Sequence, residues 1–478
     1  MRKVFLFIGA IALSSAVFAG GFLTNTNQSI RFLRDPARGA STEIDAVYSN
    51  PAGLSFMEHD GLWLSLNNQS AFQTRTATTT YAPFAMNGGS DTKEYKGEAS
   101  AWFIPSLQAA YKLKDFVFSG FFSVIGGGGT LKFDNGLPSF EVPVAQLPVM
   151  ANTMLQQMGM PPDYNITKYS LEQSLKGTAI TYGAQLGVSY KISDMFSAYI
   201  GGRASFVNNG YEGYLRNIQI NPNIPPMGLS GDNMIPATTF IQGLAAAGAI
   251  DEATANTLLS KVSDKEINVK QSGWGISPVL GFDFKYEHFN LGIKYDFKTI
   301  IDIKNKTTKD DVGMFADGEK TPYDIPALLS IGASYKFLQE KLTLNIGSHI
   351  FFDKDARMKD DRQKTLSDNT YEWLGGVEYK INKRFLVSAG GQITRFGLTD
   401  EYLSDMNIYC NSYSLGIGGE IGITEHLLVN VGYLFTKYKD YTKTDSSFAP
   451  LSSLYGPGSS EKYHRTSNTF GIGIDYKF

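Results

Sequence analysis

The chain has 478 residues, a formal net charge of −3 and a single cysteine. This charge balance gives no reason to expect nucleic acid as a partner. Cys410 alone can form neither an internal disulfide nor a cysteine metal site, and the five histidines lack metal-ligand spacing, so no metal or cofactor is expected. After residue 20 no apolar run approaches the roughly 18 residues of a membrane-spanning helix, which excludes helical spans from the remainder.

The N-terminus has the pattern of a secretory signal peptide. Arg2 and Lys3 precede an apolar run at residues 4–13, and a stretch of small residues ends at Ala19. Cleavage after Ala19 would remove residues 1–19. A signal anchor is the alternative, but the apolar run is about half the roughly 20 residues that a spanning helix needs. We therefore expect an exported protein.

Alternation of apolar and polar residues with period 2 predicts fourteen strands. Single-chain bacterial barrels have even strand numbers, and most of these segments reach the roughly 9–11 residues that a tilted membrane strand needs. The pattern thus predicts an all-β protein, a 14-stranded antiparallel transmembrane β-barrel. The expected strands are 61–71, 99–112, 116–125, 177–191, 195–208, 273–286, 288–303, 325–337, 341–353, 371–381, 384–398, 411–423, 426–438 and 466–478.

The connections between these strands alternate between short and long. Short turns of such barrels are periplasmic and long loops extracellular, so both chain ends are expected on the periplasmic side. Side chains that face the lumen should include Asn290, Lys294, Asp296 and Lys298 on one strand, and Arg203, Asp283, Lys285, Glu372, Glu378 and Glu420 elsewhere. These charges either pair and fill the barrel or line a transport path.

A polar segment precedes the first strand, and it carries the motif Asn50-Pro51-Ala52 followed by Gly53-Leu54. With fourteen strands and a terminal Phe478, this arrangement resembles the FadL family of outer-membrane transporters for long-chain fatty acids and other hydrophobic compounds. Residues 101–106 and 273–275 add to the resemblance. It implies an N-terminal hatch at residues 20–58 inside a barrel of residues 59–478. It also implies diffusive uptake, from an apolar site on the outer loops to an exit through the barrel wall.

Ligand-binding residues are predicted at two places. Inside the barrel, the resemblance and the inward orientation point to the basic side chains Arg203, Lys298, Arg357 and Lys359. In the long loops 126–176 and 209–272, three methionines at helical spacing would share one helical face, and two further helices are expected near residues 240–248 and after Asp251. The apolar faces either pack on each other or form a deformable groove for ligand. The predicted groove residues are Met150, Met154, Met158, Phe240 and Leu244.

A lateral opening is predicted at the outer end of the third strand, where four glycines follow one another: Gly126, Gly127, Gly128 and Gly129. Glycine weakens strand pairing through backbone entropy and leaves no side chain to pack. The resemblance places a kink of the family in this same strand. The alternative is that the glycines only begin a flexible loop.

Two other functions compete with transport. A lipid hydrolase of the outer membrane would need a positioned nucleophile and base, and the sequence has neither a Gly-x-Ser-x-Gly nor a His-Glu-x-x-His motif. A general diffusion porin would not need residues 20–58.

We therefore expect a monomeric transporter and not an enzyme, located in the outer membrane of a Gram-negative bacterium. Its expected partners are a hydrophobic small molecule, outer-membrane lipid and lipopolysaccharide, and the barrel-assembly machinery.

Overall fold

The computed structural model describes residues 24–444 and 458–478. The predicted signal peptide, residues 1–19, lies outside the described residues, as do residues 20–23 of the predicted hatch. No helix within the described ranges is both long and apolar enough to cross a membrane.

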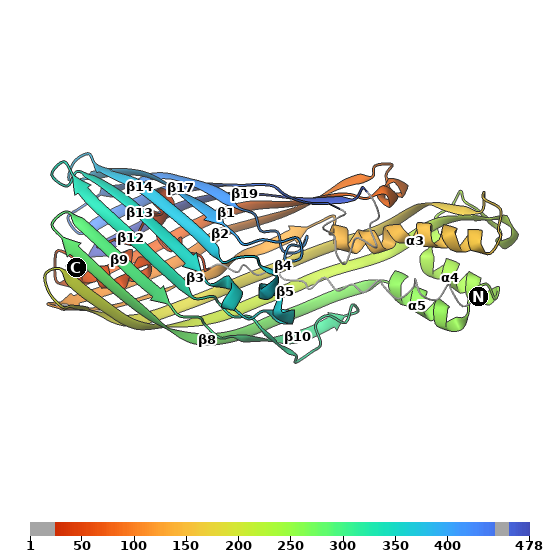
Figure 1. Cartoon of the computed structure of the whole chain (residues 1–478), viewed down its shortest axis with the longest axis horizontal. Coiled ribbons are helices and arrows are strands. Elements are labelled where there is room, and N and C mark those ends of the chain that lie inside the picture. Colours follow the sequence, from red (N-terminus) through yellow and green to blue (C-terminus); the bar gives the residue numbers. More distant parts are fainter. Residues whose placement is uncertain (1–23, 445–457) are drawn as a thin grey trace.

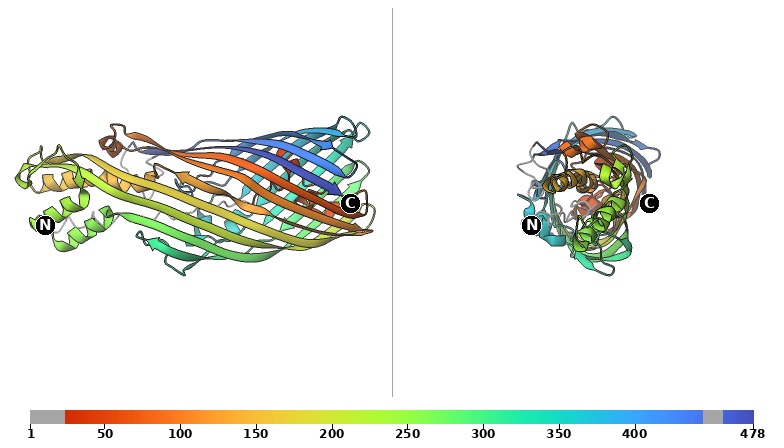
Figure 2. Two further views of the ribbon diagram at one scale, coloured as in Figure 1. Left: turned by 180° about the vertical axis from the view of Figure 1, so that it is seen from behind. Right: turned by 90° about the vertical axis from the view of Figure 1, so that its right-hand side faces the viewer.

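The strands form one antiparallel sheet that closes into a barrel when β1 pairs with β19 (Figures 1 and 2). Fourteen strands form the wall, which confirms the predicted barrel. They are β1 (Gly61–Thr80), β2 (Thr92–Leu113), β3 (Phe116–Phe133), β4 (Asn165–Lys191), β5 (Phe196–Ile224), β8 (Lys265–Tyr286), β9 (Phe289–Asp296), β12 (Leu328–Phe337), β13 (Leu342–Phe351), β14 (Thr370–Lys380), β15 (Phe385–Arg395), β16 (Ser412–Gly422), β17 (Leu427–Tyr438) and β19 (Ser460–Lys477). Shorter strands extend the wall or its loops: β6 (Leu229–Ser230), β7 (Ile235–Pro236), β10 (Asp302–Asp310), β11 (Lys320–Pro322) and β18 (Tyr441–Thr444).

The two faces of the wall differ as the alternation predicts. Along β9 every second residue, from Asn290 to Asp296, is buried inside the barrel. On the outer face, Leu186, Ile200 and Leu415 are 76%, 66% and 68% exposed. Exposed apolar side chains of this size, repeated on strand after strand, form a surface that an apolar solvent would stabilise.

The segments predicted as the long loops 126–176 and 209–272 begin and end as strand, which corrects that expectation. β3, β4, β5 and β8 continue well beyond the predicted strand ends, and β4 and β5 project furthest past the rest of the barrel (Figure 1). Their outer parts pair with each other, and Arg216 on β5 meets Glu172 on β4 at 3.0 Å. Alternation missed these parts because a strand that leaves the membrane zone no longer needs one apolar face.

Three helices cover the outer end of this projection, where helices were expected: α3 (Pro138–Gln157), α4 (Ala237–Ala246) and α5 (Glu252–Val262). The side chain of Asp251 caps α5 by accepting a hydrogen bond from the backbone N of Thr254 at 2.7 Å, as predicted. Short helical turns lie at η3 (Ala82–Met86), η4 (Pro225–Met227), η5 (Asp353–Asp355) and η6 (Lys359–Thr365).

Residues 24–58, here called the interior segment, contain α1 (Ile30–Arg34), α2 (Ala46–Ser49) and η2 (Pro51–Phe56). α1 contacts β1, β15, β16, β17 and β19, whereas η2 contacts β2, β3, β4, β5 and β8. Wall glycines permit this close approach: a Cβ atom on Gly416 would lie 2.1 Å from the carbonyl oxygen of Leu33, and one on Gly376 would lie 1.9 Å from the carboxylate of Asp35. The segment therefore packs against both sides of the ring.

Candidate functional site

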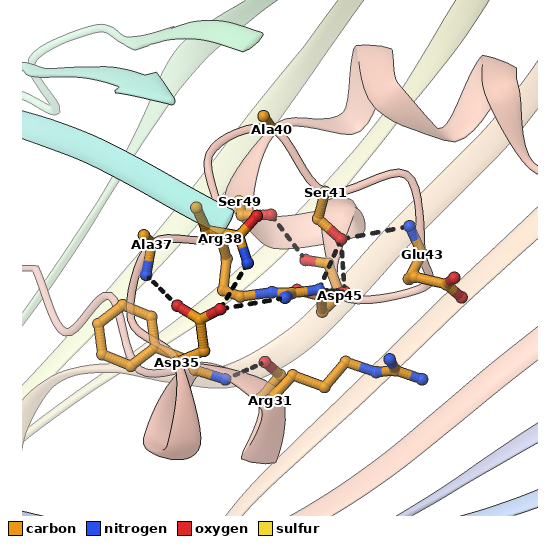
Figure 3. Close-up of polar contacts among 12 residues, drawn as sticks. Arg31, Asp35, Ala37, Arg38, Ala40, Ser41, Glu43, Asp45 and Ser49 are labelled. Carbon is orange, nitrogen blue, oxygen red and sulfur yellow. Dashed lines mark hydrogen bonds and ion pairs between the residues drawn. The ribbon is translucent and has the colours of Figure 1, made fainter. Parts of the chain in front are cut away.

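Buried ion pairs join the interior segment to the wall. Arg31 lies 2.7 Å from Glu420 and 3.0 Å from Asp475, which belong to β16 and β19. Arg38 donates to Asp45 within the segment at 2.7 Å (Figure 3). It also lies 3.2 Å from Glu378 of β14. A buried pair that loses one partner leaves an uncompensated charge, so these contacts resist separation of the segment from the wall.

The two aspartates beside Arg38 have opposite pKa shifts. Burial acts to raise the pKa of Asp45, but the Arg38 guanidinium outweighs it and holds this pKa below its usual value. Burial, followed by the charge of Glu378, raises the pKa of Asp35 to about 6. Asp45 is thus ionised and forms the short ion pair with Arg38. Asp35 is held mainly by Asn345 of β13, which donates to it at 2.6 Å.

The Asn50-Pro51-Ala52 motif contacts three neighbouring wall strands. The Asn50 amide donates to the carbonyl oxygen of Phe282 and to the carboxylate of Asp283 on β8, each at 3.1 Å. The carbonyl oxygens of Pro51 and Ala52 accept hydrogen bonds from wall hydroxyls on β4 and β5 at 2.6 and 2.7 Å. The motif therefore fastens the end of the interior segment to the wall opposite the α1 contacts.

Strands β2 and β3 do not pair with each other over the middle of their length. Their pairing runs from the turn to Ser106 and Ser123, stops, and resumes at Ala99 and Leu131. Residues 100–105 of β2 and 124–130 of β3 therefore form an interruption in the wall, here called the β2–β3 gap. Pro105 has no N–H to donate, and Gly127 and Gly129 have φ values of +78° and +93° that favour glycine. The predicted opening glycines lie in this gap.

The interior segment hydrogen-bonds to the β3 side of the gap. Asn25 donates from its backbone to Ile125 at 2.7 Å and from its side chain to Gly127 at 2.9 Å. Gln28 donates to the carbonyl oxygen of Val124 at 3.1 Å. Buried carbonyl groups need partners, so the segment replaces part of the pairing that β2 does not supply.

A cavity of about 240 Å³ lies beside the gap, inside the barrel. The interior segment lines it with residues 24–27 and Phe32, and the gap lines it with Gly127, Gly129 and Thr130. Hydroxyl groups also line it, together with two arginines that were not predicted, Arg75 of β1 and Arg465 of β19.

The four basic residues predicted to bind ligand have other partners. Arg203 lies 2.5 Å from Asp296, and Arg357 lies 3.0 Å from Asp324. The Lys298 and Lys359 ammonium groups donate to the backbone carbonyl oxygens of Asp355 and Met314 at 3.0 and 3.1 Å. Among the described residues that line the cavity, none is one of these four.

The apolar residues predicted in the outer helices do come together. Met150, Met154, Met158, Phe240 and Leu244 all line one apolar cavity of about 50 Å³ between α3, α4 and α5. Below it, the buried carboxylate of Glu141 holds α3 in place by accepting hydrogen bonds from Tyr95, Tyr169 and Lys93 at 2.7, 2.8 and 2.5 Å.

No family model matches the chain, and no curated protein sequence gives a significant match. Solved structures match over most of its length. The toluene transporter TodX of P. putida has a TM-score of 0.55 at 15% identity, over 92% of this chain and 95% of that one. A FadL homologue of Pseudomonas aeruginosa has a TM-score of 0.57 at 13% identity, over 95% and 98%. The toluene transporter TbuX of Ralstonia pickettii has a TM-score of 0.54 at 14% identity, over 95% and 99%. The resemblance to the FadL family is thus confirmed for the fold.

Proposed function

We propose that the protein is an outer-membrane transporter that takes up hydrophobic small molecules by diffusion and is not an enzyme. The observation that carries this proposal is the β2–β3 gap, which lies beside an internal cavity and is bonded to the interior segment. A wall that is interrupted beside an internal cavity gives an apolar molecule a route into lipid without crossing water. The toluene transporters that share the fold support the same conclusion.

The ligand's route runs from outside the cell, through the barrel, into the membrane. The apolar cavity between α3, α4 and α5 receives the ligand outside the cell, the inner cavity holds it within the barrel, and the gap releases it sideways. Both chain ends are then periplasmic, and the protein works as a monomer. It is inserted by the barrel-assembly machinery and surrounded by lipid and lipopolysaccharide.

Residues 20–58, which include the interior segment, act as the hatch. Its ion pairs to β14, β16 and β19 hold it inside the lumen. A general diffusion porin keeps an open aqueous channel instead. The hydrolase alternative gains no support from His349 and Ser348. His349 is paired with Glu372 at 2.9 Å, and the Ser348 hydroxyl donates to the backbone of Glu372.

Uptake of radiolabelled toluene by Gram-negative host cells tests the function. Cells that produce the protein should accumulate label faster than cells with an empty vector, and excess unlabelled toluene should compete. Toluene uptake equal to the vector control, with the barrel inserted and heat-modifiable, would contradict the proposal.

A further inference from the structure

Four exposed lysines form a cluster on the outer face of the wall, where β10 and β11 extend the sheet beside the outer half of β8 (Figure 1). They are Lys270 of β8, Lys304 and Lys306 of β10, and Lys320 of β11, here called the lysine cluster. The residues that alternate with them face inward: Gln271 and Asn305 are buried and hydrogen-bond to each other at 2.8 Å. The lysines therefore point away from the lumen.

The lysines of the cluster lie opposite each other in two pairs. Lys306 is the register partner of Lys270, and Lys304 is the register partner of Lys320. Like charges that are directly opposed on one face destabilise a pair of strands. This part of the wall therefore needs an interaction that compensates the repulsion.

The protein supplies no carboxylate for this purpose. Among the residues that the structure describes, no carboxylate lies within 4.0 Å of a lysine of the cluster. Asp302 lies two positions before Lys304 on the same face, but it is paired with Arg357 at 3.4 Å. A lysine on the outer part of β4 shows the contrast, because Lys176 lies 2.9 Å from Glu212 of β5. The charge of the cluster is thus available to an anion outside the chain.

The position of the cluster along β8 corresponds to the head-group level of a membrane. On the outward face of β8 every second residue from Tyr286 to Trp274 is apolar or aromatic, and Trp274 is 64% exposed. At about 3.3 Å per residue and a tilt of about 40°, this stretch crosses about 30 Å, roughly the thickness of the hydrocarbon core. Ser272 and then Lys270 follow on the same face. The cluster therefore begins where the apolar surface ends.

Phosphate is the anionic group that lipids place at this level. A lysine ammonium binds phosphate as a point charge, and clusters of four or more basic side chains beside the hydrocarbon region are typical of binding to anionic lipids. The two pairs share β10, where Lys304 and Lys306 are about 7 Å apart along the strand. Each pair can therefore hold one phosphate group, and the arrangement fits a lipid that carries two.

We propose that the lysine cluster binds the phosphate groups of a lipid of the outer leaflet that carries two phosphates, the class to which the lipid A part of lipopolysaccharide belongs. Its acyl chains lie along the apolar outer face, against Ile276 and Ile300, which are 64% and 61% exposed. The bound lipid removes the repulsion between β8, β10 and β11. This inference rests on the proposed function for the orientation that places the outer end of β8 outside the cell.

Native mass spectrometry of the delipidated full-length protein in detergent, titrated with bisphosphorylated lipid A, tests the site. Wild type should bind this lipid, and K270Q/K304Q/K306Q/K320Q should lower the affinity at least tenfold, because each lysine near the membrane surface contributes to the attraction of an anionic lipid. The variant should stay folded, since the four side chains are exposed and their opposed charges are removed. K270R/K304R/K306R/K320R keeps the charges and should bind lipid A like wild type.

The matched control is K114Q/K341Q/K383Q/R384Q. It removes four exposed positive charges from the turns at the opposite end of the barrel, so the net charge of the protein changes equally. This variant should bind lipid A like wild type. Phosphatidylglycerol, which has one phosphate, and dephosphorylated lipid A should both bind wild type more weakly than bisphosphorylated lipid A.

Four results would overturn the inference. The glutamine variant of the cluster could bind lipid A as tightly as wild type, or the control could lose the same affinity. Dephosphorylated lipid A could bind wild type equally well, which would mean that the acyl chains alone are recognised. Inorganic phosphate could bind as tightly as lipid A, which would make the cluster a site for a free ion.

Toluene uptake by cells separates this inference from the proposed function. The cluster lies outside the inner cavity, so its glutamine variant should take up toluene at the wild-type rate while it loses lipid A binding. Absence of toluene uptake in wild type, with lipid A binding intact, would refute transport and leave the lipid site in place.

Discussion

The arginines that point into the lumen differ in the groups that they contact. Those of the interior segment are matched by carboxylates of the wall, so they contribute to holding the segment in place. The inward orientation of Glu378 and Glu420 followed from the strand alternation in the sequence. The pairing of these carboxylates with Arg31 and Arg38 did not, because the interior segment has no periodicity that fixes where its side chains point.

Arg75 and Arg465 show why some residues that line the inner cavity could not be found from sequence. Arg75 lies beyond the predicted end of its strand at residue 71, and Arg465 lies one residue before the predicted start of the last strand. Only the register of the extended strands makes these residues neighbours. By contrast, the basic residues that the sequence did suggest are used in structural contacts, and their role in binding stays a prediction.

The substitution D45N should loosen the interior segment. It removes the charge that Arg38 contacts at 2.7 Å and leaves a buried guanidinium with Glu378 at 3.2 Å as its main partner. Loss of one partner from a buried pair costs roughly 3 kcal/mol or more. We expect faster proteolysis of residues 24–58 and more frequent channel openings in planar bilayers. E172Q, which breaks the exposed pair with Arg216, is the control and should leave both unchanged. Equal proteolysis of D45N and wild type would show that this pair does not anchor the segment.

At the scale of elements, the strands and the outer helices were largely predictable. Period 2 marks the membrane-facing part of each strand, because lipid and lumen demand different side chains. Helical spacing of Met150, Met154 and Met158 marked α3, although Met158 itself is the residue after its last turn. The outer continuation of β3, β4, β5 and β8 was missed, since a strand with polar residues on both faces gives no period-2 pattern.

The substitution A101W should close the β2–β3 gap. An ideal Cβ atom on Gly129 would lie 3.5 Å from the Ala101 side chain, so Ala101 faces β3 across the gap. An indole ring at this position would fill the opening without changing a paired residue of the β2–β3 ladder. We expect toluene uptake to fall at least tenfold, with toluene binding to the purified protein preserved.

The control for this test is A109W, on the same strand but in the regular pairing with Gly120. It adds the same bulk away from the gap and should leave uptake near the wild-type rate. Normal uptake by A101W would place the exit elsewhere in the wall.

At the scale of the whole molecule, the wall and the interior segment have separate roles. The wall closes through its own backbone pairing, with β1 against β19 over eighteen residue pairs, and does not use the segment for closure. The segment instead contacts strands on both sides of the ring, through side chains and through backbone groups. Glycines such as Gly376 and Gly416 make room for it, and their inward positions could have indicated a filled lumen. Glycine is common in strands for several reasons, so the sequence alone could not single out this cause.

Deletion of residues 24–58 should therefore give a barrel that still inserts and conducts ions freely. The pairing between the wall strands remains, and the lumen loses the groups that neutralise Glu378, Glu420 and Asp475. Water can then hydrate these inward carboxylates and cations can pair with them, which should make the channel cation-selective. In planar bilayers we expect a steady, much larger conductance than that of wild type, and heat-modifiable migration on gels would verify that the shortened protein is folded. A folded deletion variant with the small conductance of wild type would show that residues 24–58 do not block the lumen, and the transport route through a hatch would have to be abandoned.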